Sequence, residues 1–367
     1  MRILYVLTDA KIGGAETLVE TLAANKDSED TVGLLVLLGP DELSPRLEQA
    51  FDFVEYLDVG EESRNIVKMV RGLEALVKRF KPSVIHSNLF HADLVTLLAR
   101  TGGVPKVTTI HTQGFGPRDH PLTKLIARAV GIGSFRFSSV IPIGPTSHKF
   151  AQSLGYKGLV DSISNSANVS RTSLFDVTNT CFVSIGRFHP VKGHAILLEA
   201  YSRVRKNHPH WSLICTGPGV DPSNEELIQL VHSVGLDSAL RSGALILAGS
   251  THDVGGVLSR STALIISSLY GETFPMVGVE ATGAGIPVIT TNVGESRVFA
   301  FDESYVVRPG DSDELAAAMI KFISLTSEEK LTASEGLRRR ALRDFNPRDL
   351  VAKYRTVYSE VISRSTD

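Results

Sequence analysis

Residues 262–292 read TALIISSLYGETFPMVGVEATGAGIPVITTN and contain one complete strand–helix–strand unit. The apolar runs at 262–268 and 287–292 predict two buried strands, and the segment 276–284 between them predicts a helix. Apolar strands that are separated by a helix are typical of a parallel sheet covered on both faces. Pro275 suits the start of this helix, because its missing N–H is not needed in the first turn.

The same alternation of strands and helices extends outward in both directions. Strands are also predicted at 2–8, 31–38, 53–59, 83–88, 106–112, 138–144, 160–166, 181–187, 211–217, 244–249 and 304–309. Helices are predicted at 14–24, 64–80, 91–100, 120–131, 145–154, 192–206, 223–234, 252–260, 312–325 and 327–343. Ser, Asn and Thr replace the apolar residues around 164–180, which is typical of a linker.

This pattern predicts an α/β protein with two Rossmann-like domains, residues 1–170 and 178–346. A last helix, 348–367, is expected to pack back on the first domain. Parallel sheets bind ligands at the carboxyl ends of their strands. Two such sheets that faced each other would therefore place both binding edges on one interdomain cleft.

Composition is that of an ordinary globular chain. The 367 residues are 43% hydrophobic with a net charge of −2, and no apolar run approaches the ~20 residues of a membrane span. Cys181 and Cys215 lie in strand-like runs, so we expect buried free thiols and a cytoplasmic protein. Residues 101–160 carry seven basic side chains, Arg118 among them, and one acidic side chain, Asp119, which gives a net charge of +6. This excess fits an anionic partner or membrane surface, or simply a solvated basic face.

Two carboxylates flank the predicted start of the helix at 276–284. The first N–H groups of that helix, at Met276 and Val277, would form an anion site. Glu272 lies in the preceding loop, and Glu280 lies one turn into the helix. Both could accept hydrogen bonds from sugar or ribose hydroxyls. Alternatively, Glu272 is a favourable charge near a helix N-terminus and Glu280 an ordinary helix residue.

Two cations follow the strand predicted at 181–187. Gly186-Arg187 ends the strand, and Lys192-Gly193 opens the next helix. A cation at a helix start opposes the helix dipole, so Lys192 has no structural reason to lie there. The pair would suit a diphosphate. A surface ion pair remains the alternative for Arg187, and ion pairs away from a ligand groove would contradict the assignment.

Together these elements resemble the family-4 retaining glycosyltransferases, which have the GT-B fold. The resemblance covers nearly the whole chain, with Glu272 and Glu280 as the E-x7-E signature. It implies that Arg187 and Lys192 hold the diphosphate, that Glu272 binds the transferred sugar and that Glu280 binds the ribose. Further donor-binding positions implied by the resemblance are Thr273, Phe274, Pro275, Met276 and Val277, with Asp253 and Val254 near the nucleotide base. Thr273 replaces the family's usual glycine, and Ser166 and Asn168 follow the linker Asn165 in place of glycine and aspartate.

The first half contributes a second set of residues. The turn Gly13-Gly14 opens the first helix, and the resemblance places Gly14 beside the leaving phosphate. His111 ends the strand at 106–112, and in the family a histidine here lies near the reacting sugar. We therefore predict that His111 acts in positioning or proton handling. His86 and His91 flank Asn88 and either line the same edge or have no role there.

The resulting hypothesis is a retaining transferase that moves a sugar from a UDP- or GDP-linked donor to a glycan or lipid-linked acceptor. Peripheral association with an anionic inner membrane face is expected, and no nucleic-acid partner. No cofactor and no metal are expected, since Asp311-Ser312-Asp313 resembles a helix cap. A sugar-nucleotide epimerase and a non-catalytic partner subunit remain alternatives. A dehydrogenase lacks support, because no G-x-G-x-x-G motif follows the first strand.

Overall fold

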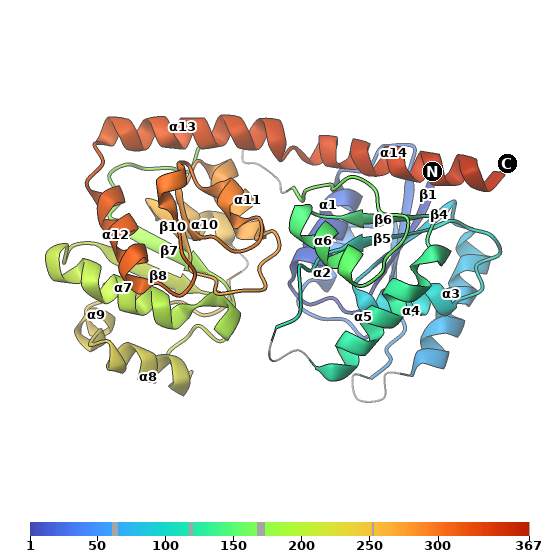
Figure 1. Ribbon diagram of the computed structural model, residues 1–367, viewed down its shortest axis with the longest axis horizontal. Helices are drawn as coiled ribbons and strands as arrows, with labels where there is room; N and C mark the ends of the chain where they lie inside the picture. Colours follow the sequence, from blue (N-terminus) through green and yellow to red (C-terminus); the bar gives the residue numbers. More distant parts are fainter. Residues whose placement is uncertain (61–64, 117–119, 167–172, 252, 367) are drawn as a thin grey trace. The chain divides into compact units, whose positions relative to one another are not determined.

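A computed structural model describes residues 1–60, 65–116, 120–166, 173–251 and 253–366. It divides the chain into two compact units (Figure 1). Unit 1 comprises Met1–Ser166 and Pro347–Asp367, and unit 2 comprises Ala167–Asn346. Each unit contains a six-stranded sheet in which all paired strands are parallel. The predicted α/β class is therefore confirmed.

Unit 1 contains a sheet with the order β3-β2-β1-β4-β5-β6. Its strands are β1 (Arg2–Leu7), β2 (Thr31–Val36), β3 (Phe53–Tyr56), β4 (Val84–Asn88), β5 (Lys106–Ile110) and β6 (Ser139–Pro142). Its helices are α1 (Gly14–Ala24), α2 (Ser44–Ala50), α3 (Ile66–Phe80), α4 (Phe90–Leu98), α5 (Pro121–Gly133), α6 (Pro145–Ser153) and α14 (Pro347–Thr366). One core cluster joins α1, α2 and α14 to one sheet face, and another joins α3 and α4 to the other face.

The last helix, α14, belongs to the core of unit 1. Leu350, Val351, Tyr354, Tyr358 and Val361 are buried in the same cluster as residues of β1 and β2. Apolar positions at this spacing form one helical face, so the helix packs on the sheet from Leu350 to Val361.

Unit 2 contains a sheet with the order β12-β11-β10-β7-β8-β9. Its strands are β7 (Cys181–Ile185), β8 (Ser212–Thr216), β9 (Leu245–Leu247), β10 (Ala263–Ile266), β11 (Val288–Thr291) and β12 (Val306–Val307). Its helices are α7 (His194–Asn207), α8 (Glu225–Ser233), α9 (Asp237–Arg241), α10 (Val254–Leu258), α11 (Met276–Ala284), α12 (Ser312–Ile323) and α13 (Ser327–Asp344).

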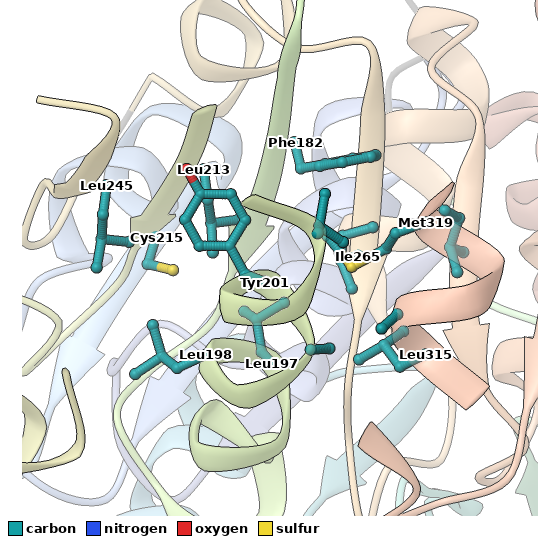
Figure 2. Close-up of a cluster of buried hydrophobic side chains, with 14 of the residues drawn as sticks. Phe182, Leu197, Leu198, Tyr201, Leu213, Cys215, Leu245, Ile265, Leu315 and Met319 are labelled. Atoms are coloured by element: carbon teal, nitrogen blue, oxygen red, sulfur yellow. The ribbon is translucent and has the colours of Figure 1, made fainter. Parts of the chain in front are cut away.

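Figure 2 shows part of the core between this sheet and the helices α7 and α12. Tyr201 is fully buried there, and its hydroxyl donates to the carbonyl oxygen of Ala244 at 2.8 Å. Cys181 and Cys215 are buried free thiols, as predicted. The core holds the strands in place, so their carboxyl ends form a fixed edge for the loops that follow them.

One predicted strand is absent from the described structure, and two short helices are additional to the prediction. Residues 160–166 form no strand. Val160 and Ile163 donate backbone hydrogen bonds to Val140 and Pro142, but only Leu159 forms an isolated bridge. Polar residues at 161, 162, 164 and 165 give this stretch no continuous apolar face to bury. The short helices α2 and α9 were not predicted. Within the linker, Asn168 and its neighbours at 167–172 lie outside the described residues.

Candidate functional site

The loop between β7 and α7 is fixed by the ends of the neighbouring strands. The backbone N–H of Gly186 donates to Thr216 at 2.9 Å, and that of Phe188 donates to Pro218 at 2.7 Å. Gly193 has a φ of 65°, and a Cβ there would lie 2.1 Å from the carbonyl oxygen of Ser267. The loop therefore passes directly over the carboxyl edge of the sheet, and it needs glycine to approach β10 so closely.

Lys192 and Glu272 are brought together at this edge. The Nζ of Lys192 lies 2.5 Å from Oε2 of Glu272, although the residues are 80 positions apart. The Ser268 hydroxyl donates to the same oxygen at 2.9 Å. The lysine is paired, but its partner is another residue of the predicted site. An ammonium has three N–H donors, so Lys192 retains donors for a phosphate while it holds Glu272.

Arg187 lies in the same loop as Lys192 and is exposed. Its guanidinium forms no hydrogen bond or ion pair with any side chain in the part of the chain that the structure describes. The surface ion pair that was the alternative for Arg187 is therefore not seen among these residues. A guanidinium is a planar cation with five donors, which suits a phosphate group.

The loop that carries Glu272 leads into α11, which begins at Met276 with Pro275 as its N-cap. Phe274 is buried against Phe299, with ring centroids 5.0 Å apart, and also contacts Phe345. Thr273 is buried, and its carbonyl oxygen accepts from the N–H of Glu295 at 2.9 Å. The predicted donor loop is thus held on both sides by packing and backbone hydrogen bonds.

The remaining predicted residues of unit 2 lie on two helices. Val277 and Glu280 are half-buried in α11. Asp253 caps α10 and accepts a hydrogen bond from the N–H of Gly256 at 2.7 Å, and Val254 begins that helix. Since α10 contacts α11, these residues belong to neighbouring elements of unit 2.

Unit 1 carries Gly14 and His111. Gly14 begins α1, and the Glu16 carboxyl folds over the turn, so that a Cβ on Gly13 would lie 2.4 Å from its Oε2. Burial raises the pKa of Glu16 to about 8. The Nε2 of His111 lies 2.9 Å from Oδ1 of Asn88, and burial lowers the pKa of this histidine to about 3. The imidazole is therefore neutral at physiological pH.

Two family models match this chain. Glycosyl transferases group 1 matches residues 166–338, and Glycosyl transferase 4-like domain matches residues 13–158. The chain belongs to the group 1 glycosyltransferases. The first match covers unit 2 with its Lys192–Glu272 pair, and the second covers the part of unit 1 that carries Gly14 and His111.

Individual relatives of this group 1 glycosyltransferase are distant. It is 26% identical over 195 residues to an exopolysaccharide phosphotransferase of Streptomyces coelicolor, which covers 52% of this chain and 20% of that protein. It is 27% identical over 188 residues to a D-inositol 3-phosphate glycosyltransferase of Salinispora arenicola, covering 49% of this chain and 41% of the relative. The chain therefore spans less than half the length of these two curated relatives.

A solved structure with the same fold is that of HepE from Anabaena in complex with UDP-glucose. Its TM-score is 0.81 at 20% identity, covering 99% of this chain and 100% of HepE. This likeness confirms the GT-B fold that was expected for the group 1 family.

Two site residues of this group 1 glycosyltransferase were not predicted. Ser268 binds Glu272, and the signal for it was the Ser267-Ser268 pair at the end of an apolar strand. His194 is the first residue of α7, and its ring lies 5.4 Å from that of Phe188. Burial, together with the nearby charge of Lys192, lowers the pKa of His194 to about 4. Nothing in the sequence pattern distinguishes this histidine from an ordinary helix residue.

Other predictions concerned metals and membranes. Across the described ranges, no group of three or more His, Cys, Asp or Glu side chains is placed to hold a metal ion. Asp311 caps α12 by accepting from the N–H of Glu314 at 2.8 Å, as predicted. None of the helices that the structure describes is long and apolar enough to cross a bilayer.

Proposed function

We propose that this group 1 family member is a retaining glycosyltransferase. It moves a hexosyl or N-acetylhexosaminyl group from a UDP- or GDP-linked donor to a glycan or lipid-linked acceptor, in the synthesis of a cell-surface polysaccharide or glycolipid. The proposal depends on one observation above all. Lys192 and Glu272 form an ion pair at the carboxyl edge of the unit 2 sheet, in the same loop system as the exposed Arg187.

The arrangement supports the departure of a nucleoside diphosphate. Lys192 and Arg187 supply two cations for the charge that develops on the diphosphate as the bond to the sugar breaks. The Oε2 of Glu272 is occupied by Lys192 and Ser268, whereas no described residue binds its Oε1. This second oxygen is left to accept a hydrogen bond from a sugar hydroxyl. One carboxylate thereby couples the sugar to the cation that binds the leaving group.

The relatives support the choice of substrates to test. HepE is described in complex with UDP-glucose, which makes UDP-linked sugars the first donors to try. One relative is named for an exopolysaccharide and another for an inositol phosphate. The first name fits a glycan acceptor, and the second is that of a glycosyltransferase named for a polyol phosphate.

The decisive experiment measures nucleoside diphosphate release from a panel of UDP-, GDP- and ADP-sugars, with the product identified by mass spectrometry and its anomeric configuration by NMR. We expect transfer with retention, and a loss of about 100-fold or more in kcat for Lys192→Ala and for Glu272→Gln. Lys321→Ala, on the exposed face of α12, is the matched control and should keep full activity.

Each alternative predicts a different result in the same assay. A product that remains a nucleotide sugar would identify an epimerase. Thermal stabilisation by donors without any turnover would identify a non-catalytic partner subunit. Full activity of Lys192→Ala would contradict the proposed site, because it would show that the Lys192 cation does not stabilise the departing diphosphate.

Unit 1 carries an exposed apolar surface. In α5 and the turn that follows it, Leu125 is 64%, Ile132 73% and Phe135 72% exposed. Lys124, Arg128 and Arg136 lie in the same stretch, whereas Arg118 and Asp119 lie outside the described residues. Apolar side chains beside basic ones suit the interface of an anionic bilayer. This surface supports peripheral membrane association and a lipid-linked acceptor.

Co-sedimentation with vesicles tests this part of the proposal. We expect more protein to bind phosphatidylglycerol vesicles than phosphatidylcholine vesicles, and Leu125→Ser with Phe135→Ser to reduce that binding by about tenfold or more. Val67→Ser removes an equally exposed apolar side chain from α3 and should leave binding unchanged. Equal binding to the two kinds of vesicle would contradict membrane association through charge.

A further inference from the structure

Two histidines of unit 1 have different surroundings: His86 lies within β4, and His111 follows the end of β5. His86 is completely buried, and both of its ring nitrogens have partners: Nδ1 lies 2.7 Å from the Tyr358 hydroxyl, and Nε2 lies 2.8 Å from that of Thr109. Among the described residues, His111 has a partner at Nε2 alone, where Oδ1 of Asn88 lies 2.9 Å away. Both ring nitrogens of His86 are therefore engaged within the fold, whereas no described residue bonds Nδ1 of His111.

The second nitrogen of His111 is buried and unbonded. Among the described residues, neither Nδ1 of His111 nor Nδ2 of Asn88 has a hydrogen-bond partner. Buried polar atoms almost always have partners, so two orphans on one bonded pair require an explanation. Residues two apart on a strand share a face, so Asn88 lies on the face of β4 that also carries His86 and meets α14.

We propose that Asn88 is a positioning residue that holds the His111 proton on Nε2, so that Nδ1 accepts a hydrogen bond from a sugar hydroxyl. The amide oxygen of Asn88 is an acceptor only, so the ring nitrogen that faces it donates. A neutral imidazole then has its lone pair on the other nitrogen. This lone pair points away from the Asn88 amide, because the two nitrogens of an imidazole lie on opposite sides of the ring.

The surroundings keep the ring in this state. Burial lowers the pKa of His111 to about 3, and Asn88 introduces no charge that would favour the imidazolium. The pKa of His86 is also lowered to about 3, by its burial and by His111. Both rings are therefore neutral between about pH 5 and 8. The assignment of the hydroxyl to a sugar rests on the proposed function, whereas the tautomer does not.

The tautomer is tested by NMR on the full chain with 15N-labelled histidine, in which the His111 signals are assigned by their loss in His111→Gln. In the wild type we expect one neutral tautomer, protonated on Nε2, that does not titrate between about pH 5 and 8. Asn88→Ala should give a mixture of the two tautomers. Asn88→Asp should raise the pKa of His111 into the measured range, since a carboxylate favours the charged ring. A proton on Nδ1 in the wild type, or an unchanged ring in Asn88→Ala, would overturn the proposal.

The sugar contact is tested by transfer kinetics. Asn88→Ala should lower kcat by about tenfold with little change in the donor KM, as expected for one misdirected hydrogen bond. Asn88→Asp should lose activity as the pH falls through the new pKa of His111, because Nδ1 then carries a proton and donates. The wild type should show no such inflection.

The matched control is Ser87→Ala. Ser87 precedes Asn88 on β4, is equally buried, and its hydroxyl donates to Asp93 at 2.6 Å. This variant should lose some stability and keep both kcat and the His111 tautomer. An equal loss of kcat in Ser87→Ala and Asn88→Ala would reduce Asn88 to a structural role and overturn the proposal. A wild type that transfers no sugar would contradict the proposed function, and the NMR result would still decide the tautomer.

Discussion

Gly294 shows at the scale of one residue how the Glu272 loop is kept in place. Its φ is 57°, and a Cβ there would lie 1.8 Å from the carbonyl oxygen of Glu272. An alanine would therefore meet two costs, the left-handed backbone and a collision with the donor loop. The loop and the glycine-containing turn after β11 can approach only because position 294 has no side chain.

We expect Gly294→Ala to lower the stability of unit 2 by about 2–5 kcal/mol and to weaken UDP binding. The left-handed conformation accounts for roughly 1–2 kcal/mol, and the collision adds roughly 1–3 kcal/mol. Gly310→Ala is the matched control, because Gly310 has a φ of 81° and no atom within 4 Å of its Cβ position. Urea unfolding followed by the fluorescence of Trp211, the single tryptophan, measures unit 2. An equal loss of unfolding free energy in the two variants would show that the Glu272 loop moves away from the added Cβ at no cost.

The sequence can indicate individual site residues, but it cannot predict which residues far apart in the chain contact each other. Lys192 is predictable, because a cation at a helix start opposes the helix dipole. Glu272 is predictable from its E-x7-E spacing with Glu280. Their mutual ion pair is not predictable, because it depends on how two loops 80 positions apart meet above the sheet. The bond between Asn88 and His111 likewise depends on the register of β4 and β5.

At the scale of elements, α4 is attached to the sheet through a buried acid. Asp93 accepts hydrogen bonds from Ser87 on β4 at 2.6 Å and from Thr108 on β5 at 2.7 Å. Burial raises its pKa from 3.8 to about 7. Between these values the folded unit holds a proton that the unfolded chain has lost. The free energy of unfolding therefore falls as the pH rises through this range.

Asp93→Asn should remove this pH-dependent cost. Relative to the wild type, the variant should gain about 1.4 kcal/mol of stability for each pH unit between about pH 4 and 7. Urea unfolding followed by far-UV circular dichroism at several pH values measures the difference. Trp211 fluorescence reports unit 2 in the same samples and should be unaffected. A difference between variant and wild type that is constant over this range would refute the titration of Asp93.

The sequence predicted the long strands and helices correctly, but not the short or mostly polar segments. Long alternating stretches predicted most of the strands and helices, because buried parallel strands are almost continuously apolar. The error at 160–166 came from a few apolar residues in a polar stretch, where backbone bonds to Val140 and Pro142 hold the chain without a strand. The short helix α9, Asp237–Arg241, has too few turns for a periodic signal.

At the scale of the whole molecule, unit 1 is built from both ends of the chain. Five buried side chains of α14 complete its core, each of which contributes about 1.5–3 kcal/mol. Their sum is comparable to the whole stability of a typical domain, which is about 5–15 kcal/mol.

A chain that stops at residue 346 should therefore lose unit 1 and keep unit 2. Hydrogen exchange followed by mass spectrometry should show β1 and β4 unprotected, whereas β7 and β8 exchange as slowly as in the full chain. A matched deletion of residues 363–367, of which 363–365 are exposed, should change neither unit. Retained protection of β1 in the shorter chain would contradict the role assigned to α14.

The position of α14 also governs the order of events on the ribosome. Some 180 further residues must be translated after Ser166 before Pro347 appears, which at typical elongation rates takes on the order of 10–40 s. Residues 1–166 cannot complete the core of unit 1 until α14 has been synthesised, whereas unit 2 can fold before then. The nascent first half consequently presents an uncovered apolar sheet face, which makes it a natural client for chaperones during synthesis.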